Sequence, residues 1–156
     1  MKKLILVLVA AVAFCFSASA ERTSVPYAGL CVTSNFADIT GPGMVVGFRN
    51  YNRNSFISVG IGGEAYSYYI PSVNQFGAFA VPEIGLAIGF KGFKLYPHTG
   101  LMAGYDTKNA GFSWGGKDGL AFDFGKNFTL DFSTYVPGYR FSAATYTVGL
   151  IWRFGK

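Results

Sequence analysis

The chain ends on the sequence YTVGLIWRF at residues 146–154, followed by Gly155 and Lys156. Successive side chains of a β-strand point to opposite faces, so every second residue of this stretch shares a face. One of these faces is wholly apolar and aromatic, and it consists of Tyr146, Val148, Leu150, Trp152 and Phe154. A strand with such a face requires either lipid or a protein core to cover it.

The N-terminal residues predict export. Two lysines precede an apolar run at residues 4–16, and Ala18-Ser19-Ala20 supplies the small residues that a signal peptidase requires. We therefore expect residues 1–20 to form a signal peptide, cleaved after Ala20, and residues 21–156 to form one domain. Removing 20 of the 156 residues leaves 136 and lowers the formal net charge from +5 to +3, because two lysines are lost. The remaining basic residues are scattered, which argues against nucleic acid as a partner.

Composition separates a membrane protein from a soluble one. Charged residues make up 13% of the chain, against about 25% in soluble domains, and the mean hydropathy is positive. After the leader, no apolar run approaches the roughly 20 residues of a membrane helix. A closed β-barrel is the other structure that satisfies all backbone groups in lipid. Cys31 would be the only cysteine left, and we expect it to be a small buried side chain in the first strand.

Alternating segments separated by turn residues predict eight strands. They cover residues 25–34, 43–49, 55–69, 76–90, 93–105, 117–124, 128–135 and 143–154. The connections are expected to alternate in length, with tight turns at 50–54, 91–92 and 125–127 and mostly longer loops at 35–42, 70–75, 107–116 and 137–142. Short periplasmic turns and longer external loops are typical of outer-membrane barrels.

The leader, the eight strands and the terminal strand together resemble the small bacterial outer-membrane barrels of OmpA-like or OmpX-like type. That resemblance implies an all-β, eight-stranded antiparallel up-and-down transmembrane β-barrel with both termini in the periplasm. It also implies outer-membrane lipid as a partner, and the barrel-assembly machinery, which reads the last strand of this family as an insertion signal. Gly155-Lys156 differ from the family's usual terminal Phe, and its peptidoglycan-binding domain is not expected here.

Aromatic residues are predicted to form two belts at the levels of the lipid headgroups. The belt beside the tight turns would contain Phe48, Tyr51, Phe56, Phe90, Phe93, Phe124, Phe128, Trp152 and Phe154. The belt at the other end would contain Tyr69, Phe76, Tyr105 and Tyr135.

With the apolar face outward, the opposite face fills the barrel. This parity sends a set of polar residues inward as a structural network: Arg49, Glu64, Glu83, Lys94, His98, Asp123, Asp131 and Arg153. The interior of an eight-stranded barrel is only just wide enough for side chains, so a general pore is not expected. Pro82 and Pro97 are candidate bulges that would shift the parity beyond them.

The positions of the hairpin turns predict which residues of this network lie beside one another on paired strands. Symmetric turns place Glu64 opposite Val81 and diagonal to Glu83, and place Glu83 opposite Gly100 and diagonal to His98. Two carboxylates and the only imidazole would then share one space. A separate ion-pair layer nearer the periplasm would contain Arg49, Lys94, Arg153, Asp123 and Asp131.

Enzyme motifs are nearly absent, and neither a cofactor nor a metal is expected. The leading hypothesis is therefore a non-enzymatic integral outer-membrane protein, either structural or loop-presenting, with roles in envelope integrity, adhesion or interaction. The external loop at residues 106–118, with Phe112 and Trp114, is the candidate contact surface for an extracellular ligand.

Two alternative functions stay open from the sequence. A lipid-modifying barrel enzyme would use His98 with Ser58, Glu64 or Glu83 as neighbours, although Gly100 stands where the His-x-Ser pair of the barrel deacylases requires Ser. A soluble periplasmic barrel of lipocalin type would turn its apolar face inward and would carry more charges outside.

Overall fold

A computed structural model describes residues 23–35, 40–109, 111–140 and 144–154 of the chain. The predicted signal peptide at residues 1–20 lies outside the described residues. The strands are β1 (Thr23–Asn35), β2 (Thr40–Tyr51), β3 (Ile57–Ile70), β4 (Gln75–Phe90), β5 (Phe93–Asp106), β6 (Gly111–Phe124), β7 (Phe128–Pro137) and β8 (Thr145–Arg153). Two short 3₁₀ turns, η1 (Pro71–Val73) and η2 (Thr107–Asn109), connect β3 to β4 and β5 to β6.

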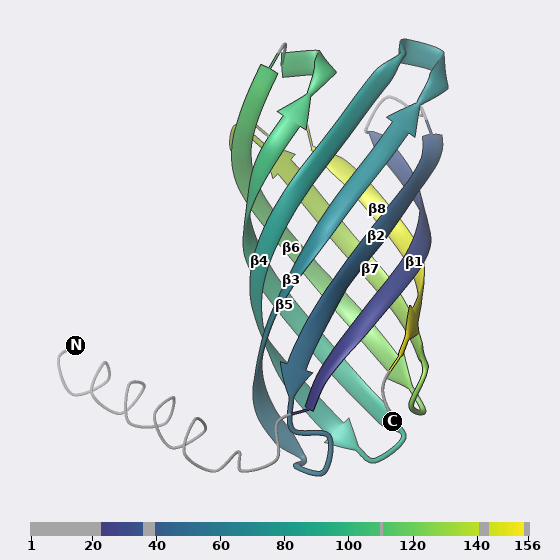
Figure 1. Ribbon diagram of the computed structural model, residues 1–156, viewed down its shortest axis with the longest axis vertical. Helices are drawn as coiled ribbons and strands as arrows, with labels where there is room; N and C mark the ends of the chain where they lie inside the picture. The colour runs from purple at the N-terminus through teal and green to yellow at the C-terminus, as the bar shows by residue number, and fades with distance from the viewer. Residues whose placement is uncertain (1–22, 36–39, 110, 141–143, 155–156) are drawn as a thin grey trace, which may run out of the picture.

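The eight strands form a closed barrel in which each strand pairs antiparallel with its neighbours in the sequence. Closure comes from β1 and β8, which pair from Tyr27↔Arg153 to Asn35↔Thr145. Figure 1 shows strands that run alternately up and down, with the start of β1, the end of β8 and the tight turns at one end of the barrel. Because the sheet has no free edge, the backbone groups of every strand have a partner strand on both sides. The predicted fold class is therefore correct.

The described residues contain no helix that is long and apolar enough to cross a membrane.

The connections do not alternate in length as predicted. At the end where long loops were expected, β1–β2, β3–β4 and β5–β6 are joined by four residues each, because β2 begins at Thr40 and β6 at Gly111, and only the connection between β7 and β8 is longer, at residues 138–144. The segment 111–116 contains three glycines and reads as a loop, but it continues the ladder through Tyr105↔Phe112 and Ala103↔Trp114. A Cβ atom on Gly115 would lie 2.1 Å from the carbonyl oxygen of Val136. Glycine thus permits close strand approach here and does not end the strand.

The two strand prolines do not produce bulges. On either side of Pro82 the register of β4 and β5 is the same, with Ala80↔Ala103 and Glu83↔Gly100, and Pro97 pairs in register with Leu120. Both prolines are exposed on the outside of the barrel. The alternation of inward and outward side chains therefore continues unbroken, and the predicted bulges are wrong.

Apolar side chains cover the outside of the barrel. Leu30 is 73% exposed, Leu101 63% and Leu150 55%, and the residue that follows each of them in the strand is buried. The final strand follows the predicted pattern: Val148, Leu150 and Trp152 face outward, while Thr147, Gly149 and Arg153 face inward.

Aromatic rings lie on the outside at both ends of the barrel. At the tight-turn end the exposed rings are Phe48, Phe56, Phe90, Phe93, Phe124, Phe128, Trp152 and Phe154. At the opposite end they are Tyr69, Phe76, Tyr105, Phe112, Trp114 and Tyr139, and the rings of Trp114 and Tyr139 meet edge to face at 5.3 Å. Two predicted members are wrong, because Tyr51 and Tyr135 are buried inside. Phe112 and Trp114 are strand residues of this second belt and are not loop residues.

Tyrosines and glycines fill the interior together. Tyr27, Tyr51, Tyr66, Tyr68, Tyr96 and Tyr135 are all at most 3% exposed. The ring of Tyr96 lies against Gly60 and Gly85, and a Cβ atom on either glycine would come within 2.6 Å of it. Cys31 is a free, buried thiol on β1, as predicted.

Candidate functional site: the charged interior

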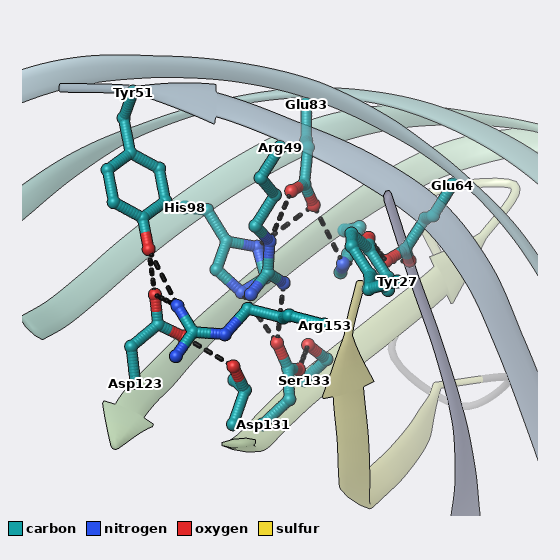
Figure 2. A network of polar contacts seen from close by, with 12 residues as sticks. Tyr27, Arg49, Tyr51, Glu64, Glu83, His98, Asp123, Asp131, Ser133 and Arg153 are labelled. Carbon is teal, nitrogen blue, oxygen red and sulfur yellow. Dashed lines mark hydrogen bonds and ion pairs between the residues drawn. The ribbon is translucent and has the colours of Figure 1, made fainter. Parts of the chain in front are cut away.

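All eight polar residues predicted to face inward are buried in the barrel, and most belong to one connected network (Figure 2). Charged side chains are rarely buried unless they are paired, so the arrangement of partners decides what this site can do. The network has a central cluster and a second layer nearer the tight turns.

Arg49 organises the central cluster. Its Nε donates to Oε1 of Glu83 at 2.9 Å, and its Nη2 donates to Oδ2 of Asp131 at 2.7 Å. The guanidinium carbon also lies 5.0 Å from the ring centroids of both Tyr27 and Tyr96. Such stacking suits the planar, delocalised cation of arginine. Arg49 therefore occupies the middle of the barrel, held by two carboxylates and two rings.

His98 lies between the same two carboxylates. Its Nδ1 is 3.4 Å from Oε2 of Glu83, and its Nε2 is 3.2 Å from Oδ2 of Asp131. The predicted pairings Glu64↔Val81 and Glu83↔Gly100 are present and bring the imidazole beside Glu83. The hydroxyl of Ser133 donates to the other oxygen of Asp131.

Lys117 is the main functional side chain that the sequence analysis missed. It is fully buried on β6, and its Nζ lies 2.7 Å from Oε1 of Glu64 and 3.0 Å from Oε2 of Glu83. Lys117 is the first residue of the predicted strand at residues 117–124 and also falls within the expected contact loop at residues 106–118, but the sequence analysis does not include it among the inward-facing residues. Counting back from Asp123 in steps of two residues along β6 reaches Lys117 and predicts that its side chain faces inward.

Two tyrosine hydroxyls donate hydrogen bonds to the carboxylate of Glu64. Tyr27 donates to Oε2 at 2.9 Å and Tyr135 donates to Oε1 at 2.7 Å. The ring of Tyr135 stacks on Tyr66 with centroids 4.0 Å apart. Each oxygen of this buried carboxylate thus has a donor, which lowers the cost of keeping a charge away from water.

The second layer is built around Asp123. Arg153 Nη1 lies 2.7 Å from Oδ2 of Asp123, Thr129 donates to Oδ1 at 2.5 Å, and Tyr51 also donates to this carboxylate. The other arm of the guanidinium, Nη2, donates to the carbonyl oxygens of Gly125 and Phe128, each at 3.0 Å. Arg153 therefore ties the end of β8 to the tight turn between β6 and β7.

The predicted composition of this layer is partly wrong. Arg49 and Asp131 lie in the central cluster, because the long guanidinium of Arg49 reaches Glu83 on β4 and Asp131 on β7. Lys94 donates to the carbonyl oxygens of Gly89, at 2.8 Å, and of Ser55, and no ion pair of Lys94 is found among the described residues. Glu64 and Glu83 are also less crowded than expected, because Lys117 lies between them.

The central cluster combines three carboxylates with a guanidinium, a lysine ammonium group and one imidazole. Glu64, Glu83 and Asp131 face Arg49, Lys117 and His98. Nucleophilic chemistry needs a hydroxyl that donates to the imidazole. Here the hydroxyl of Ser133 donates to Asp131 instead, and Ser58 donates to the carbonyl oxygen of Asn52 at 3.2 Å.

Metal binding has no support in the described part of the chain, where no three His, Cys, Asp or Glu side chains are grouped to hold an ion. The ion pairs of the central cluster instead link strands to one another across the barrel interior.

No family model matches the sequence, and no curated protein matches it. Among solved structures, a de novo designed transmembrane β-barrel aligns with a TM-score of 0.48 and 13% identity, over 83% of this chain and 95% of that chain. Ail, the attachment invasion locus protein of Yersinia pestis, solved in complex with the heparin analogue sucrose octasulfate, aligns with a TM-score of 0.48 and 16% identity, over 86% of this chain and 99% of that chain.

Proposed function

We propose that this protein is a non-enzymatic integral protein of a bacterial outer membrane, in which it acts as a closed structural barrel. The observation that carries the proposal is the inverted polarity of the barrel wall. Leu30, Leu101 and Leu150 are exposed outside, whereas Arg49 and Lys117 are buried inside at 1% and 0% exposure. In water this arrangement would leave apolar surface unburied, but in lipid it is the stable one.

The orientation follows from the ends of the barrel. The start of β1 and the end of β8 lie at the tight-turn end (Figure 1). An exported chain with a leader at residues 1–20 would leave that end in the periplasm. Its partners would then be outer-membrane lipid and the barrel-assembly machinery, with β8 as the strand that this machinery recognises.

A structural role is favoured over a pore because side chains occupy the middle of the barrel. Arg49 packs between Tyr27 and Tyr96 and joins Glu83 to Asp131, so the network crosses the interior in several directions. An eight-stranded barrel has no room for a water column beside such a plug. The protein would stiffen the membrane without making it permeable.

Catalysis is not proposed, because both nitrogens of His98 face carboxylates and the residue is only 5% exposed. A lipocalin type of function would need an apolar interior, and here the interior is charged. A loop contact through Phe112 and Trp114 is not proposed either, since both lie on the outer wall of β6.

Fractionation and electrical recording test this function together. We expect the protein to fractionate with outer membranes and, when unheated in detergent, to migrate as a compact species distinct from the boiled one. Planar bilayers containing it should show no steady, large conductance. A protein that stays monomeric in water without detergent would refute the membrane assignment, and a large stable conductance would refute the closed barrel.

A further inference from the structure

The tight-turn end of the barrel carries a ring of cations. Each of the three tight turns contributes one basic residue: Arg53, Lys91 and Lys126. Below them, two basic side chains of the barrel interior, Lys94 and Arg153, face the same space. These five residues line a single cavity of about 330 Å³ at this mouth of the barrel.

No acidic side chain lines this cavity. Its remaining lining residues are Tyr51, Asn54, Phe90, Gly92, Phe93 and Gly125. Asp123 lies behind Arg153, and its oxygens are already taken by Arg153, Thr129 and Tyr51. Among the described residues, only Arg153 of the five cations forms an ion pair, so the cavity keeps a large excess of positive charge.

Several donors of the mouth are not used within the described protein. The Nε atoms of Arg53 and Arg153 are buried and have no hydrogen-bond partner among the described residues. Arg153 as a whole is only 2% exposed. Arg53 makes one hydrogen bond, from Nη2 to the carbonyl oxygen of Lys126 at 3.2 Å. Lys91 and Lys126 are exposed at the rim. Buried guanidinium donors without acceptors are costly unless water or a bound ligand supplies oxygen atoms.

We propose that this cavity is a binding site for an oxyanion of the phosphate type. A cleft lined by one sign of charge concentrates counterions, and Arg and Lys donors make strong, short hydrogen bonds to phosphate oxygens. The phosphate group has two possible sources: the headgroup of an anionic phospholipid in the adjoining leaflet, or a soluble phosphorylated compound. The site is independent of the central cluster and goes beyond the structural role proposed above.

A matched pair of double variants tests the site. Lys91→Gln/Lys126→Gln removes two rim charges at the cavity, and Lys108→Gln/Arg140→Gln removes two exposed charges at the opposite end of the barrel. The protein is placed in phosphatidylcholine nanodiscs, and binding of inorganic pyrophosphate is measured by calorimetry. The compact unheated gel species shows that each variant is folded.

We expect pyrophosphate to bind the original protein more weakly as salt rises. We also expect Lys91→Gln/Lys126→Gln to weaken binding by about tenfold or more, through loss of two charge-assisted contacts. Lys108→Gln/Arg140→Gln should change it by less than about twofold, because charges at that distance are screened.

A second measurement distinguishes the two phosphate sources. Replacing part of the phosphatidylcholine by phosphatidylglycerol should raise the unfolding temperature of the original protein, and not of Lys91→Gln/Lys126→Gln, if the ligand is a lipid headgroup. Pyrophosphate binding without this lipid effect would identify a soluble ligand. The proposal is overturned if neither probe has an effect, or if both double variants respond equally.

Discussion

Arg49 on β2 donates to Asp131 on β7 across the interior, with an Nη2 to Oδ2 distance of 2.7 Å. These strands are not neighbours in the sheet, so the contact adds a cross-link that the backbone ladder does not provide. The same guanidinium holds Glu83 on β4. One side chain therefore connects three strands through the middle of the barrel.

Replacing Arg49 by Ala should destabilise the barrel by about 3 to 5 kcal/mol, because it leaves Glu83 and Asp131 buried with fewer cationic partners. Urea unfolding of the protein in lipid vesicles would measure the loss. Lys108→Ala, which removes an exposed cation at the end of the barrel, serves as the control and should change stability little. A loss below about 1 kcal/mol for Arg49→Ala would mean that the network does not hold the barrel together.

The Lys117 contact predicts coupling between charges. Lys117→Met should cost about 3 to 5 kcal/mol, since it removes the cation between Glu64 and Glu83. Adding Glu64→Gln to this variant should cost less than the sum of the two single changes, because the second change removes a stranded carboxylate. A double-mutant cycle in the same unfolding assay tests this. Additive costs would show that Lys117 and Glu64 do not interact energetically.

His98→Ala separates a structural role from a catalytic one. We expect lower barrel stability, because Glu83 and Asp131 lose a shared neighbour, and we expect chemically unchanged envelope lipids. Mass spectrometry of phospholipids and lipid A from cells with either version measures the second point. Altered lipids in the variant, with the barrel still folded, would favour the enzyme.

A charged side chain added to the outer wall of the barrel should lower the stability of the protein in a bilayer. Leu150→Arg places a cation on the apolar exterior near the middle of β8 and should cost about 2 to 4 kcal/mol of stability in a bilayer. Thr147→Val, an inward change on the same strand, does not place charge in lipid and should cost less. Equal stability of Leu150→Arg and the original protein would contradict a lipid-facing wall.

Asp118 is a carboxylate on this same outer wall. It is exposed on β6, opposite Thr99 on β5 and Thr134 on β7. A charge on a lipid-facing strand is unfavourable, so Asp118→Leu should stabilise the barrel in a bilayer by about 1 kcal/mol. The same change should have little effect in zwitterionic detergent, where water reaches the wall more easily. Destabilisation in the bilayer would show that Asp118 has a partner there.

Much of the fold was predictable because strand alternation and tight turns act locally. The turn at Lys91-Gly92 fixes the pairing of Phe90 with Phe93, and from it the register that places Glu83 opposite Gly100. In the same way, the alternation of residues 146–154 sufficed to predict the lipid-facing side of β8.

The remainder depended on contacts between strands that are distant in sequence. The sequence around Gly115 is typical of a loop, and only the close approach of the Val136 backbone shows that it belongs to a strand. Tyr51 and Tyr135 face inward because their hydroxyls donate to Asp123 and Glu64. The reach of Arg49 to Asp131 likewise depends on the shape of the closed barrel. The central cluster could therefore be predicted only in part.

The seam between β1 and β8 has a consequence for biogenesis. The first strand to leave the ribosome finds one of its two partners only when the last strand has been made. Until then β1 keeps an open edge, which is prone to pair with other chains. In the outer-membrane location proposed above, the chain would cross the periplasm in an unclosed form, protected from aggregation. Lys117, Arg49 and their carboxylates would stay hydrated until the seam closes, and we expect their desolvation to coincide with the completion of the ladder.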